Sequence, residues 1–232
     1  MKRRPLLSRL QRLASPYARD KKRGVPRGTL LNHPDFNDFQ ERAWEIMENF
    51  IWRPGDVIVV GKGTLAEEMR QFIGEFWDEA VNRNVIWEKM TSGELGGLFS
   101  YLGDEYAKRA VRLKPLVLPR GLSEELRVYY QEAIQCWVHG LNAAAIILLG
   151  SVIEEVLCVV LDGSAPNLRR KRIGELIAMA NSKRLLNGNT TNTLRLIYHL
   201  RNRATHERSG ISETQVFDAI MSVQQVIWDT SK

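Results

Sequence analysis

The chain has 232 residues, of which 44% are hydrophobic, enough for one large core or for one core and a smaller appendage. Its net charge of +6 and pI near 9.4 favour polyanionic partners such as RNA, although they say nothing about fold. The only cysteines, Cys136 and Cys158, form no Cys-x-x-Cys pair and no zinc-spaced cluster with histidine. We therefore expect no disulfide framework, no metal and no cofactor, and a cytoplasmic location.

The amino-terminal segment, residues 1–28, is a basic arm. Arginines interrupt its scattered leucines, so it does not have the pattern of a secretory signal. We predict a solvated, poorly ordered arm. Two alternatives remain open: the arm contacts nucleic-acid phosphates, or its leucines form a short amphipathic helix that docks on a partner.

Residues 29–114 predict a mainly helical region of unknown type. Apolar residues at helical spacing indicate helices over 36–52, 64–83 and 95–113. Residues 56–60 are the one convincing strand-like run, and 116–118 are a weak candidate for its partner. The aromatic residues of these helices are predicted to be core, because no basic motif alternates with them as in a base-stacking platform. They include Phe72, Phe76, Trp77 and Tyr101.

Residues 115–232 predict a four-helix domain, so the expected fold class is all-α, a helical bundle preceded by a mainly helical region. Four strong helical signals and one shorter helix follow one another. The predicted ranges are 123–140, 142–161, 173–180, 190–206 and 212–228.

Polar residues mark the starts of these helices. Ser123, followed by two glutamates, is expected to cap the first helix, and Thr190 or Thr191 the helix that ends at His206. Ser212 with Gln215 predicts a capping box for the last helix.

The most apolar run of the sequence extends from Ala143 to Val160. Ser151, Glu154 and Glu155 interrupt it, and acidic residues near the middle of a membrane-spanning helix are costly. We therefore predict a buried helix of a soluble domain and no membrane partner.

The segment Leu200–His206 carries the strongest functional signal. It places Arg201, Asn202 and His206 near the end of a predicted core helix. On an ideal helix Asn202 and His206 share a stripe with His199, whereas Arg201 lies about 140° away from His206. One copy of the helix cannot easily direct both Arg201 and His206 at one small group, so either local unwinding or a second subunit is needed.

Short features follow one another in a set order over residues 115–228, about half the chain. They are Leu118-Pro119, Glu132-Ala133, the helix start at Gly140 to Ala145, Ile153-Glu154, Ile173-Gly174-Glu175-Leu176 and Arg201-Asn202. With a His shortly after the Arg, this order resembles the HEPN superfamily (higher eukaryotes and prokaryotes nucleotide-binding), in a branch frequent in bacterial defence genes. The sequence departs from many members of that branch at Gly150, where they carry an Arg.

The resemblance implies a homodimeric, metal-independent ribonuclease in which two copies of the motif meet across a two-fold interface and make a composite site. Arg201 would hold the phosphate, His206 would exchange a proton near neutral pH, and Asn202 would orient either of them. Glu154 on the neighbouring helix could hold Arg201. Further RNA contacts are expected from a second set of basic residues, namely Arg203, Arg169, Arg170 and Lys171.

Other functions fit parts of the same sequence. A non-catalytic module of this type would bind nucleotide or RNA, or assemble with a larger defence complex, and a toxin would pair with a cognate antitoxin. In a purely structural interpretation Arg201 pairs with an acid, Asn202 caps a turn and His206 packs at the bundle edge. A DNA-binding regulator rests on charge alone, because no helix-turn-helix is evident.

Overall fold

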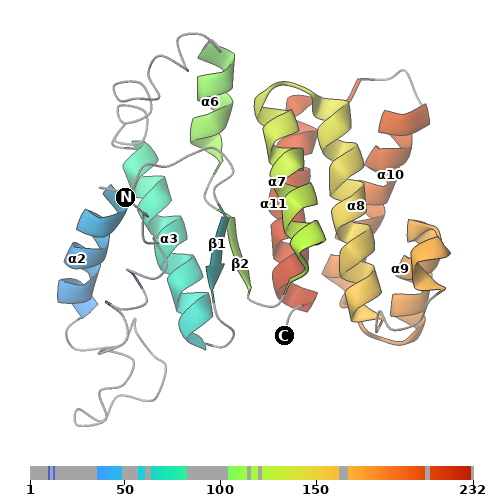
Figure 1. The fold of residues 1–232 in the computed structure, drawn as a ribbon, viewed down its shortest axis with the longest axis horizontal. Helices are drawn as coiled ribbons and strands as arrows, with labels where there is room; N and C mark the ends of the chain where they lie inside the picture. Colours follow the sequence, from blue (N-terminus) through green and yellow to red (C-terminus); the bar gives the residue numbers. More distant parts are fainter. Residues whose placement is uncertain are drawn as a thin grey trace. The chain divides into compact units, whose positions relative to one another are not determined.

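The computed structural model divides into two compact units, Met1–Arg120 and Gly121–Lys232. The residues described in it are Leu10, Leu13, 36–48, 57–60, 64–82, 104–113, 116–119, 122–161, 167–206 and 210–230. Helices carry the fold of both units, so the predicted all-α class is confirmed (Figure 1). Of the basic arm only Leu10 and Leu13 are described; both are helical, and Leu10 is buried.

The first unit contains helices and one pair of short strands. Its helices are α2 (Phe36–Glu48), α3 (Thr64–Asn82) and α6 (Asp104–Arg112), and its strands are β1 (Val57–Val60) and β2 (Leu116–Pro119). The strands pair in parallel, with Val57 opposite Leu116, which confirms the expected partnership. The predicted helix residues 49–52 and 95–103 lie outside the described residues.

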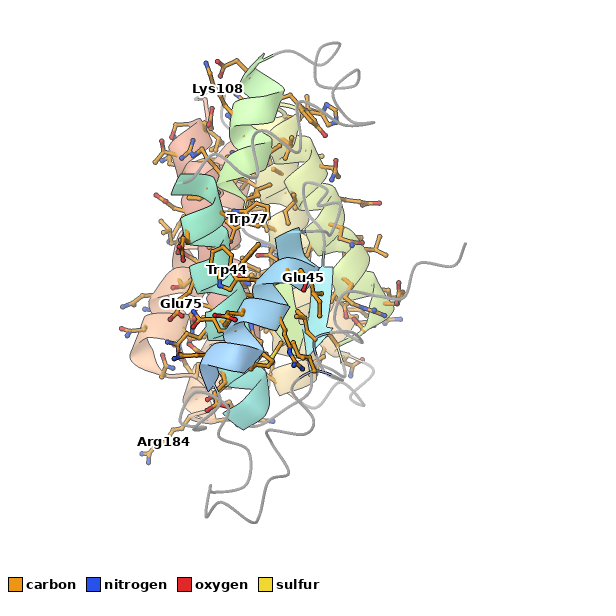
Figure 2. The ribbon with its side chains drawn as sticks, turned by 90° about the vertical axis from the view of Figure 1, so that its left-hand side faces the viewer. Trp44, Glu45, Glu75, Trp77, Lys108 and Arg184 are labelled. Carbon is orange, nitrogen blue, oxygen red and sulfur yellow. The ribbon has the colours of Figure 1, made fainter. Side chains whose placement is uncertain are left out.

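Aromatic side chains form the core between α2 and α3. The ring centroids of Phe39 and Phe72 lie 5.4 Å apart, and those of Trp44 and Phe76 lie 4.6 Å apart. Figure 2 shows Trp44 between the two helices. Phe72, Phe76 and Trp77 are buried, so their predicted core role is confirmed, whereas Tyr101 lies outside the described residues.

The second unit is a bundle built around one central helix, α8 (Asn142–Val160), which packs against α7, α9, α10 and α11 (Figure 1). The other elements are α7 (Glu124–Val138), the short 3-10 helix η2 (Leu168–Arg170), α9 (Ile173–Ser182), α10 (Gly188–His206) and α11 (Glu213–Thr230). Two buried aromatic residues join α7 to α11. The Tyr130 hydroxyl donates to the Ile220 carbonyl at 2.6 Å, and the Trp137 indole N–H donates to the Glu213 carbonyl at 3.3 Å.

Most of the predicted helix ends are confirmed. The Ser123 hydroxyl accepts from the Leu126 amide at 3.1 Å, and Gly140, with a φ of 80°, ends the first helix in a left-handed conformation. Ser212 and Gln215 form the reciprocal capping box, with bonds of 3.0 and 3.2 Å. Arg184 has a φ of 56° in the turn after α9, where a glycine would be more usual (Figure 2).

The predicted threonine cap of α10 is wrong. The cap is Asn187, whose side-chain oxygen accepts from the Thr190 amide at 2.8 Å. Thr190 and Thr191 are buried instead, and their hydroxyls bond to Asp229 on α11 and Asn181 on α9. Both threonines therefore lie in the first turn of α10 and bind it to the neighbouring helices.

Among the described residues, α8 is the one helix long and apolar enough to cross a membrane. Half of that stretch is buried inside the structure, and its more exposed side carries Glu154 and Glu155. The central position of α8 among four other helices accounts for its apolar composition. The sequence prediction that this run forms a buried helix is therefore confirmed.

Candidate functional site

The motif residues lie in the last two turns of α10. Arg201 and Asn202 are half-buried, whereas His206 is exposed in the final turn. The Thr205 hydroxyl donates to the Arg201 carbonyl at 2.8 Å, a hydrogen bond to the backbone one turn earlier in the same helix. The motif is therefore held on regular helix at one end of the bundle.

The stem of Arg201 lies against the backbone of α8 at Gly150. A Cβ atom built on Gly150 would come within 2.8 Å of Arg201 Nε and within 3.1 Å of its Cγ, and would be closer still to its Cδ. Real Cβ atoms essentially never approach another heavy atom as closely as this atom would approach Cδ and Nε. We call the space left by the missing side chain of Gly150 the Gly150 gap, and Arg201 occupies it.

Beyond the Gly150 gap, the Arg201 guanidinium meets Glu154, one turn further along α8. Arg201 Nη2 lies 3.9 Å from Glu154 Oε2, and the two side chains are 32% and 30% exposed. Burial raises the pKa of the Glu154 carboxyl, more than the charge of Arg201 lowers it, and the charge of Glu155 raises it further. The pair is long and partly solvated, so it holds Arg201 weakly.

The raised pKa of Glu154 predicts how the stability of the bundle depends on pH. A carboxyl with a higher pKa in the folded chain destabilises the fold when it is ionised, and this penalty disappears as the pH falls below the ordinary value of 4.5. Glu154→Gln is therefore expected to raise the melting temperature near neutral pH and to leave it unchanged in acid. Melting curves across this pH range, beside those of the exposed Glu132→Gln control, test the difference. A lower melting temperature of Glu154→Gln at neutral pH would contradict it.

Within one chain, the structure brings Arg201 to Glu154 but does not bring either of them to His206. Across the described part of the chain, no hydrogen bond or ion pair joins His206 to Arg201, Asn202 or Glu154. Arg203 is half-buried in the same final turns as His206. The arrangement agrees with the helical geometry of the sequence, in which Arg201 and His206 point in different directions.

The basic residues that precede α9 do not lie beside the motif. Arg169 Nη2 is 3.4 Å from Glu125 Oε2, in the first turn of α7, and 3.5 Å from Glu155 Oε2. The charge of Glu155, followed by that of Glu125, raises the pKa of Arg169. Two carboxylates therefore already balance this guanidinium, which weakens its expected role in contacting RNA.

The neighbours of Arg169 are less constrained. Lys171 Nζ lies 3.8 Å from Glu175 Oε2, and Arg170 is exposed. All three residues follow the carboxy-terminal end of α8. Ile211, five residues after His206, lies instead at the amino-terminal end of α8, because its carbonyl accepts from Nδ2 of Asn142, the first residue of α8, at 3.1 Å. A helix of this length spans about 28 Å. The basic run and His206 thus lie at opposite ends of one bundle (Figure 1).

An exposed apolar strip on α8 was not predicted from the sequence. Because α8 is apolar nearly all round, its pattern does not show which side faces the core. The structure leaves a strip of its first half exposed or half-exposed, at helical spacing. This α8 outer face consists of Ala143, Ala144, Ile147, Leu148 and Ser151.

A metal centre has no support in the described residues. They contain no group of three or more His, Cys, Asp or Glu side chains that could hold a metal ion. Burial raises the pKa of Cys136, and Glu132 raises it further, so the thiol is a poor ligand beside His139.

No family model matches the chain, and neither a curated protein nor a solved structure is similar enough to count as a match. The residues of the Arg201 site must therefore carry any argument about function.

Proposed function

We propose that the chain is a metal-independent endoribonuclease of HEPN type that acts as a homodimer. The observation that carries this proposal is the placement of Arg201. Its guanidinium lies half-exposed beside Glu154, at the edge of the α8 outer face, and Arg201 stands five residues before an exposed histidine on the same helix. A cation and a proton-transfer group on one rigid helix are the groups that phosphodiester cleavage requires.

The reaction that fits these groups is transfer of the RNA phosphate to the adjacent ribose hydroxyl. The 2'-oxygen forms a bond to phosphorus as the bond from phosphorus to the 5'-oxygen breaks. His206 is suited to take the 2'-hydroxyl proton and to return a proton to the 5'-oxygen, and Arg201 neutralises the growing charge on the phosphate. The products are a 2',3'-cyclic phosphate end and a 5'-hydroxyl end, and Asn202 orients the phosphate or the imidazole.

A second copy of the chain would complete the site. Arg201 rests against α8 and His206 points elsewhere, so one chain offers them to different places. In a two-fold dimer, Arg201 of one chain can meet His206 of the other. The α8 outer face is suited to such an interface, because it is apolar, carries small residues that allow close approach, and lies on the same helix as the Gly150 gap.

The net charge of +6 suits an RNA substrate. Arg203 adds positive charge in the final turns of α10, whereas the exposed Arg170 lies at the other end of the bundle. We place the enzyme in the cytoplasm, as a toxin or an effector of antiphage defence that a cognate antitoxin or a larger defence complex restrains.

One observation favours a second candidate, a non-catalytic module of the same type that binds nucleotide or RNA. Glu154 lies beside the Arg201 guanidinium, and within one chain His206 makes no contact with it. A phosphate that displaced Glu154 could bind Arg201 without any proton transfer. The two functions differ in whether bound RNA is cut.

The test is to incubate the purified protein with total RNA in the presence of a chelator. The wild type is expected to cut RNA and to leave 2',3'-cyclic phosphate ends, and Arg201→Ala and His206→Ala are expected not to. Arg195→Ala and His199→Ala are matched controls, because both residues are exposed on α10 and should leave cleavage unchanged. RNA that is bound but remains intact, with a dimeric protein, would support the binding module instead.

A further inference from the structure

Gly150 lies where α10 places the long side chain of Arg201 directly on the backbone of α8. Fully buried within the bundle, it faces the Arg201 stem, and a Cβ atom there would meet Nε at 2.8 Å and Cγ at 3.1 Å. A glycine inside a helix costs about 1 kcal/mol relative to alanine, so its presence in the middle of α8 has an energetic disadvantage. The Gly150 gap is the local feature that offsets this cost.

We propose that Gly150 is a positioning residue for Arg201. Because no side chain fills the gap, the Arg201 stem lies flat on α8, and its guanidinium emerges beside Glu154 at the edge of the α8 outer face. A methyl group at Gly150 would force the stem outward and move the guanidinium while leaving its charge intact. The consequence for cleavage rests on the proposed function, whereas the effect on packing does not.

Another glycine of the bundle shows that this contact is specific. Gly174, in the first turn of α9, also faces an α10 side chain, the ring of Tyr198. A Cβ atom there would lie 3.6 Å from the ring, an ordinary van der Waals distance. Alanine therefore fits at Gly174 and does not fit at Gly150 unless Arg201 moves.

The packing part of the proposal is tested by a cycle of four proteins: wild type, Gly150→Ala, Arg201→Ala and the double variant. Without the Arg201 stem, the added methyl group is expected to raise the melting temperature by about 2–4 °C through helix propensity. With Arg201 present, the same methyl group is expected to give no gain or a loss. An equal shift in both backgrounds would overturn the proposal, as would a larger rise in the wild-type background.

The positioning role is tested by RNA cleavage with the same four proteins and the Gly174→Ala control. Gly150→Ala is expected to lower kcat at least about tenfold and to change KM less than about twofold, because a displaced cation still attracts RNA but no longer stabilises the transition state. The double variant should be no slower than Arg201→Ala, and Gly174→Ala should cleave like wild type. Wild-type kcat in Gly150→Ala would overturn the positioning role. If the wild type cuts no RNA, the proposed function fails. The melting temperatures of the four proteins then decide by themselves whether the position of Arg201 depends on the Gly150 gap.

Discussion

Mixing Arg201→Ala subunits with His206→Ala subunits is expected to restore RNA cleavage that neither variant has alone. Each variant by itself should lose about 10²–10⁴-fold in rate, the usual loss for a general acid–base group or for a charge-stabilising donor. The expectation follows from the geometry of α10, in which Arg201 lies against α8 while His206 is exposed at the helix end. If each site takes one residue from each chain, the mixed dimer holds one complete site and one site without either residue.

The size of the recovery follows from random exchange of subunits. About half of the dimers are then mixed, and each has one of its two sites intact, so cleavage should return to about a quarter of the wild-type rate. Native mass spectrometry measures the mixed fraction, and single-turnover cleavage of one RNA measures the rate. The matched control mixes Arg201→Ala with subunits that carry both substitutions, which can form no complete site. A mixed dimer that forms and stays inactive would show that Arg201 and His206 of the same chain must act together.

Local signals in the sequence predicted the helix ends well. Ser123 and Gln215 form hydrogen bonds with residues three positions away, so the sequence alone contains both partners. Asn187 was missed as the α10 cap because several polar residues compete over adjacent positions. Thr190 and Thr191 do not cap the helix because they are buried against α11 and α9. That burial depends on the tertiary fold, which the local sequence does not show.

For the candidate site, the sequence proposed residues but did not show which contacts they make. The motif identified Arg201, Asn202 and His206, and the helix period showed that Arg201 and His206 point apart. Nothing local indicated that Arg201 lies in a gap at Gly150, since that contact joins residues about 50 positions apart on different helices. The sequence also could not show that Arg169 lies at the opposite end of the bundle from His206. That position depends on the antiparallel packing of α8 and α10 (Figure 1).

The second large effect is expected at the α8 outer face, where Ile147→Glu should convert the proposed dimer to monomer. A two-fold interface would place both copies of the new carboxylate in or near an apolar contact, and burying unpaired charge costs several kcal/mol. Self-association should weaken at least about 100-fold, which is about 2.7 kcal/mol. Cleavage should fall by a similar factor at protein concentrations below the new dissociation constant, because neither chain alone holds a complete site.

Val128→Glu is the matched control, since Val128 lies on α7 and its exposure of 37% equals that of Ile147. Both substitutions replace a β-branched residue within a helix, so their effects on helix propensity should be similar. Analytical ultracentrifugation over a range of concentrations compares the self-association of the two variants. Circular dichroism shows whether both variants stay folded. An Ile147→Glu protein that remains dimeric and cuts RNA would mean that the chains meet elsewhere. A folded monomer without cleavage would show that activity depends on α8, the helix against which the Arg201 stem packs.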